Sequence, residues 1–64
     1  MFVVQVKAAE QVMMNPNFAT FPEAETYAES LAAEGQRYGN FDYDEGNDKW
    51  SCGTLSITIQ IIEE

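Results

Sequence analysis

Four carboxylates lie within one short segment, and their spacing is the feature of the chain that most resembles a metal-binding site. Residues 42–48 read DYDEGND. Asp42, Asp44 and Gly46 imitate the start of a calcium-binding EF-hand loop. The twelfth position of such a loop needs a bidentate acid, and here that position falls on Gly53. The segment therefore indicates a solvated turn, and no metal site is predicted.

Enzyme chemistry finds little support in the remaining residues. Cys52 is the only cysteine, and histidine is absent. A nucleophilic cysteine needs an adjacent base, and structural zinc sites are built from cysteine and histidine. Carboxylates are so abundant that no single pair indicates acid–base catalysis. The sequence predicts a protein that is not an enzyme and that holds no cofactor or metal.

Charge is the strongest compositional signal. The 64 residues include 11 acidic and 3 basic side chains, for a formal net charge of −8, yet 45% are hydrophobic. Disordered acidic tails lack such apolar content, so we expect the acids on the surface of a folded domain. Phosphate binding requires clustered lysine and arginine, which argues against direct contact with nucleic acid or an anionic membrane. A basic protein surface is the natural partner, and the alternative is that acidity only keeps the protein soluble.

The location expected from the sequence is the cytoplasm. A lone cysteine is typical of a reducing compartment. The opening residues MFVVQVK do not resemble a signal peptide, and the apolar runs are too short to span a membrane. We expect a single domain over residues 1–64.

A helix over residues 21–34 is the best-defined element that could position these side chains. Thr20 and Glu23 match a capping box, and Gly35 is the expected stop. Apolar residues recur with the period of a helix and predict its buried stripe. They are Ala24, Tyr27, Ala28, Leu31 and Ala32.

Three strands are expected around this helix. Alternating apolar residues predict an opening strand over 2–7 and a closing strand over 55–61. Residues 37–44 are expected to form the second strand in chain order. The turn chemistry of residues 45–48 joins this second strand to the third as a hairpin. Residues 8–19 show no clear period, so they are either helical or an extension of the first strand.

The predicted fold class is α+β in the order β-α-β-β. A right-handed crossover makes the first two strands parallel, and the long third strand lies between them, antiparallel to both. The result is a three-stranded mixed sheet with one helix packed on one face. The other face is uncovered, and the first and second strands are edges.

The position of the hairpin aromatics depends on how regular the third strand is. Pairing Asp44 with Lys49 sets Tyr43 opposite Trp50. Trp50 has the opposite parity to the isoleucines that follow it. Either a bulge at Gly53 returns both sets to the core, or the strand stays regular and the aromatics form an exposed patch on the face away from the helix.

Two functions of different class follow. The first is a small binding inhibitor whose carboxylates compete for phosphate-holding lysines and arginines, in effect a DNA mimic that blocks a nucleic-acid-handling complex. The second is a non-enzymatic accessory module that homodimerises through a sheet edge or face. For the inhibitor, the partner-binding residues are acids of the hairpin and helix, with two aromatic anchors. They are Asp42, Asp44, Glu45, Asp48, Glu25, Glu29, Tyr43 and Trp50.

In type, the chain resembles the small acidic inhibitors that phages and mobile elements encode, the anti-CRISPR proteins among them. The resemblance rests on size, charge, the β-α-β-β order and the helix entry FATFPEAETYA over residues 18–28. It implies binding to a nucleic-acid-handling complex of a bacterial host. Such inhibitors share no signature motif, so no functional residue is carried over from them.

Overall fold

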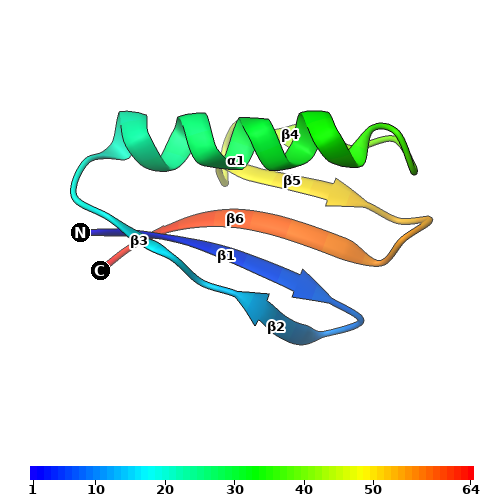
Figure 1. The fold of residues 1–64 in the computed structure, drawn as a ribbon, viewed down its shortest axis with the longest axis horizontal. Coiled ribbons are helices and arrows are strands. Elements are labelled where there is room, and N and C mark those ends of the chain that lie inside the picture. The colour runs from blue at the N-terminus through cyan, green and yellow to red at the C-terminus, as the bar shows by residue number, and fades with distance from the viewer.

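The computed structural model describes residues 1–64 and contains one helix and six strands (Figure 1). Three strands precede the helix and three follow it. In chain order the elements are β1 (Phe2–Ala8), β2 (Gln11–Met14), β3 (Asn17–Phe18), α1 (Phe21–Gly35), β4 (Asp42–Asp44), β5 (Lys49–Cys52) and β6 (Ile57–Glu63).

All six strands belong to one antiparallel sheet in the order β2-β1-β6-β5-β4, with β3 also pairing with β1. The chain is thus α+β with one helix, as expected, but the predicted three-stranded mixed sheet is wrong. β1 and β6 form the centre, paired from Phe2–Glu63 to Ala8–Ile57. β1 is therefore not an edge strand, because β2 and β3 cover its outer side.

Two unexpected hairpins account for the extra strands. Of residues 8–19, only Ala8 continues β1 and none is helical, since the chain reverses at Ala9 and Glu10 to form β2. Both turn residues have left-handed backbones, with φ of 52° and 68°, as a two-residue hairpin turn of type I′ requires. The second reversal, over residues 53–56, splits the predicted third strand into β5 and β6. This additional reversal makes β1 and β4 antiparallel rather than parallel.

The second reversal also resolves the parity of Trp50. Trp50 pairs with Ile59 and Cys52 with Ile57, so these two side chains of β5 share the face toward the helix with Ile57, Ile59 and Ile61 of β6. A turn rather than a bulge at Gly53 produces this arrangement. Trp50 is 8% exposed and Cys52 2%, so the exposed patch on the face away from the helix is wrong.

The helix packs against the sheet through its smallest side chains. Ala24, Ala28 and Ala32 are its buried residues, which lets its backbone approach the sheet closely. The Thr20 hydroxyl donates to the Glu23 carboxylate over 2.9 Å, so the two capping-box side chains bond to each other instead of to backbone N–H groups. The helix includes Gly35, where an added Cβ would overlap the Phe41 ring. Gly35 has no left-handed backbone, so it is needed here for space.

The core lies between these alanines and the helix-facing side of the sheet. Its remaining members come from β1, β5 and β6, and they are Val4, Val6, Trp50, Ile59 and Ile61. No helix in the structure is long and apolar enough to cross a membrane.

Candidate protein-binding surface

The β4–β5 hairpin has the predicted register, with Tyr43 opposite Trp50 and Asp44 opposite Lys49. The Asp44 carboxylate organises its turn. One oxygen accepts the Gly46 backbone N–H over 3.1 Å, and the other accepts the Asn47 side-chain amide over 2.8 Å. These hydrogen bonds, that from the Asn47 side chain first, lower the pKa of Asp44 below its usual 3.8. Asp44 therefore stabilises the turn, and each of its carboxylate oxygens already accepts one hydrogen bond.

Tyr43 stacks on Trp50, with ring centroids 4.7 Å apart and planes inclined by 40°. The two rings share the helix-facing side of the sheet, but they differ in burial. Trp50 is 8% exposed, whereas Tyr43 is 46% exposed. The buried Trp50 ring thus holds the Tyr43 ring in place. Of the two, Tyr43 is the one that a partner could contact directly.

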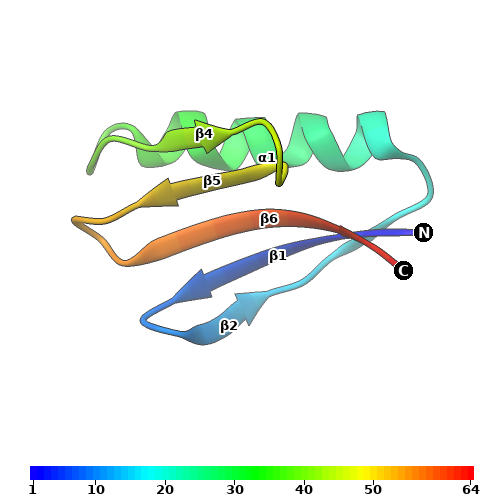
Figure 2. The same cartoon turned by 180° about the vertical axis from the view of Figure 1, so that it is seen from behind.

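Carboxylates from the helix and the hairpin act on the Tyr43 phenol. Its hydroxyl donates to Asp48 Oδ1 over 3.4 Å. Partial desolvation of the phenol, the charge and hydrogen bond of Asp48, and the charges of Glu25 and Glu45 raise the pKa of Tyr43 above 10.0. Glu25 belongs to α1, and in Figure 2 β4 is drawn in front of this helix. The fold therefore assembles the acids of the helix and the hairpin around one tyrosine.

We call this group the Tyr43 surface. Glu29 is exposed one helical turn beyond Glu25, on the same side of α1, and we include it. The members are Tyr43, Asp48, Glu45, Glu25 and Glu29.

Asp42 and Asp44 do not belong to the Tyr43 surface, although they flank Tyr43 in the sequence. Successive side chains of a strand point to opposite faces. Asp42 pairs with Ser51 and Asp44 with Lys49, so both acids face away from the helix. The eight residues predicted to bind a partner therefore divide into the five of the Tyr43 surface, the buried Trp50 beneath them, and two acids on the opposite face. Within the Tyr43 surface, Glu25 and Asp48 are half-buried and the other three are exposed.

The raised pKa of Tyr43 predicts a pH effect on stability. A raised folded-state pKa means that the neutral phenol is favoured by the fold, so its contribution is complete below pH 10 and is lost as pH rises through the folded pKa. We expect wild type to lose more stability above pH 10 than Tyr43→Phe. Chemical denaturation of both proteins between pH 8 and pH 11 measures the difference, and parallel curves would contradict the prediction.

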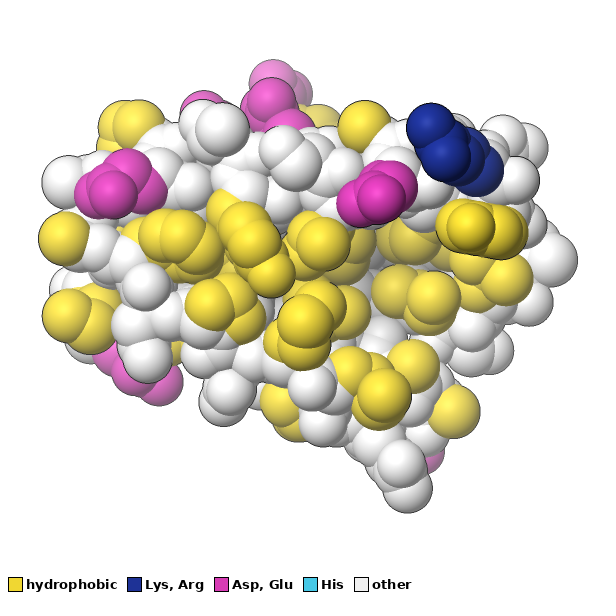
Figure 3. Space-filling view, in the orientation of Figure 1, with side chains coloured by type: hydrophobic (Ala, Val, Ile, Leu, Met, Phe, Trp, Pro, Cys, Tyr) yellow, Lys and Arg dark blue, Asp and Glu magenta, His cyan; other side chains and the backbone are white.

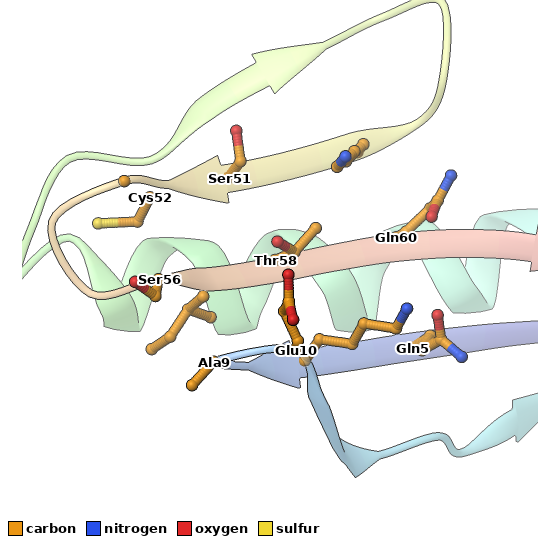
Figure 4. A pocket seen from close by; sticks show the side chains of 12 residues that line it. Gln5, Ala9, Glu10, Ser51, Cys52, Ser56, Thr58 and Gln60 are labelled. Carbon is orange, nitrogen blue, oxygen red and sulfur yellow. The ribbon is translucent and has the colours of Figure 1, made fainter.

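A polar hollow that was not predicted lies on the sheet face away from the helix (Figure 4). Its volume is about 630 Å³. Lys7 and Lys49, two of the three basic residues, line it. The neutral polar lining includes Gln5, Ser51, Thr58 and Gln60. The polar residues at alternate positions of 2–8 and 57–63 could have indicated a polar sheet face. The face away from the helix was expected to be uncovered, and its polar lining suits contact with water.

Comparison of the chain with known proteins found no matching protein-family model, curated protein or solved structure.

Proposed function

We propose that this chain is a small, non-enzymatic binding protein that uses the Tyr43 surface to engage a basic surface of a larger protein. The observation that carries the proposal is a half-exposed Tyr43 that stacks on Trp50 and bonds to Asp48, with the charges of Glu25 and Glu45 acting on the same phenol. An aromatic ring held in place by a buried neighbour loses little side-chain freedom on binding. Tyrosine is also among the residues that most often dominate interface energies.

The acids would mainly raise the rate at which the partner associates. Complementary charges raise the association rate and make it depend on salt, and the net charge of −8 supplies a long-range field of the right sign. The molecule exposes 4271 Å², so a standard footprint of about 800 Å² per partner would occupy roughly a fifth of it. Binding a larger protein would thus use a large share of this small surface.

The partner class that suits this chemistry is a nucleic-acid-handling complex. Such a complex presents lysines and arginines that normally hold phosphates, and carboxylates spread over a small surface can compete for them. Occupying those residues would inhibit the complex, as DNA mimics and anti-CRISPR-like phage proteins do. The proposed location is accordingly the cytoplasm of a bacterial host. The resemblance to such inhibitors now rests on size, charge and the helix entry, since the β-α-β-β order was wrong.

The test compares two triple variants with the same change in net charge. Glu25→Lys, Glu45→Lys and Asp48→Lys reverse the Tyr43 surface, whereas Glu10→Lys, Glu63→Lys and Glu64→Lys reverse exposed acids elsewhere. The tagged wild type captures a partner from bacterial lysate, and a salt gradient releases it for identification. Its affinity for each triple variant is then measured at fixed salt.

We expect the Tyr43-surface triple to bind the captured complex at least about tenfold more weakly than the control triple. Both variants should retain the wild-type circular dichroism spectrum, because all six residues lie outside the buried core. Equal weakening by both triples would mean that net charge alone attracts the partner. Unchanged affinity for both triple variants would mean that the acids only keep the protein soluble.

A further inference from the structure

We propose that two copies of this chain pair through their β2 edges, antiparallel about a two-fold axis, so that the two sheets become one. This contact uses a different part of the molecule from the Tyr43 surface. It is independent of the proposed function.

The outer edge of β2 is open for such pairing. β2 is the first strand in the sheet order, so it has β1 on one side and no strand on the other. An edge strand carries backbone N–H and C=O groups without partners in the sheet, and another strand can satisfy them. Charged side chains usually protect such edges, but Gln11–Met14 contains none.

The side chains of β2 are also exposed and apolar. Val12 is 48% exposed, Met13 61% and Met14 43%, and they make up half of the large exposed hydrophobic residues in the molecule. Val12 pairs with Lys7 and Met14 with Val6, so apolar groups lie on both faces of this edge. Figure 3 shows apolar side chains continuing from the helix–sheet seam toward the lower strands. Packing these side chains against a neighbouring strand is favourable, because it removes apolar surface from water.

Charge selects a second copy as the occupant. A basic partner is attracted to the acids, whereas a second copy with the same charge of −8 is repelled wherever acids lie. The neutral β2 edge is where two copies can approach most closely. The opposite edge, β4, carries Asp42 and Asp44, which oppose pairing there.

Symmetry also favours β2 with β2. Contact between identical edges closes as a dimer, whereas pairing β2 with the β4 edge of the next copy would leave free edges and continue into a filament. The proposal therefore specifies a dimer and no larger assembly.

Sedimentation equilibrium of the purified chain, from about 5 μM to about 1 mM, tests the proposal over the range expected for a small interface. We expect the molar mass to rise from monomer to dimer. The rise should occur at lower protein concentration in about 0.5 M than in about 0.02 M salt, because salt screens the repulsion between the two copies. Amide exchange should become slower at β2 as the dimer forms.

Met13→Lys is the decisive variant, because it places a lysine from each copy in the four-residue contact. It lowers the net negative charge, so a loss of pairing could not arise from greater overall repulsion. We expect the dimer to weaken at least about tenfold. Tyr38→Lys is the matched control, since Tyr38 is 74% exposed and lies outside β2, and it should dimerise as wild type does.

Three results would overturn the proposal. They are a wild type that stays monomeric at every concentration, a Met13→Lys variant that dimerises normally, and a mass that grows beyond the dimer. None of them bears on the Tyr43 surface. Binding to a basic partner weakens with salt, whereas the β2 dimer is expected to strengthen.

Discussion

Trp50→Ala is expected to leave the domain largely unfolded at room temperature. Trp50 is 8% exposed and belongs to the core cluster with Ile59 and the helix alanines. Truncating a buried tryptophan to alanine costs about 3–5 kcal/mol. A core of this size leaves a net stability of only about 3–5 kcal/mol, so one substitution removes most of it. The Tyr43 ring would also lose the surface on which it stacks.

Far-UV circular dichroism with urea denaturation measures this effect. Trp50→Phe is the matched control, because it keeps an aromatic ring in the core and should remain folded with a smaller loss of stability. Tyr43→Ala is a second control, since Tyr43 is 46% exposed and its removal leaves the core in place. A Trp50→Ala protein that stays folded with a loss below about 1 kcal/mol would show that Trp50 is not the centre of this core.

Much of the local structure followed from the sequence, because those elements carry their own signals. The alanine stripe from Ala24 to Ala32 predicted the helix and its buried side, and Gly35 marked its end. The pairing of Tyr43 with Trp50 followed from the turn chemistry of residues 45–48. Each of these depends on residues close together in the chain, where propensity and period are informative.

The extra strands could not be predicted, because the turns that create them use unusual residues. Type I′ turns usually contain glycine or asparagine, whereas this chain places Ala9 and Glu10 in left-handed backbones. Ser56 has φ of 54° in the turn before β6. In β2, the register shifts opposite Val6 and Lys7, which breaks the alternation that would have revealed a strand.

The candidate site was predictable in composition but not in arrangement. The acids of residues 42–48 were evident in the sequence. That Asp42 and Asp44 lie on one face and Tyr43 on the other follows from strand alternation alone, once Trp50 is known to face the helix. The effect of the Glu25 charge on Tyr43 depends on how α1 packs on the sheet, which is tertiary structure that no local pattern encodes. Helix packing therefore determines which acids act together.

That packing should be sensitive to the size of the helix side chains, and Ala28→Leu tests it. Ala28 is fully buried, and the close approach of α1 to the sheet leaves no room for a larger group. Inserting extra carbon atoms into a packed core costs about 1–3 kcal/mol, a large part of the stability of so small a domain. We expect the urea midpoint to fall accordingly.

Ala33→Leu is the matched control for Ala28→Leu, because it makes the same substitution in the same helix at an exposed position. It should change stability by no more than about 0.5 kcal/mol. If α1 instead shifts to accommodate the larger side chain without unfolding, the distance between Glu25 and Tyr43 should change, and the pKa of Tyr43 should move toward 10.0 as the charge on Glu25 recedes. Equal midpoints for the two leucine variants, with the pKa of Tyr43 unchanged, would contradict a tightly packed helix–sheet contact. The paired measurement thus links core packing to the electrostatics of the Tyr43 surface.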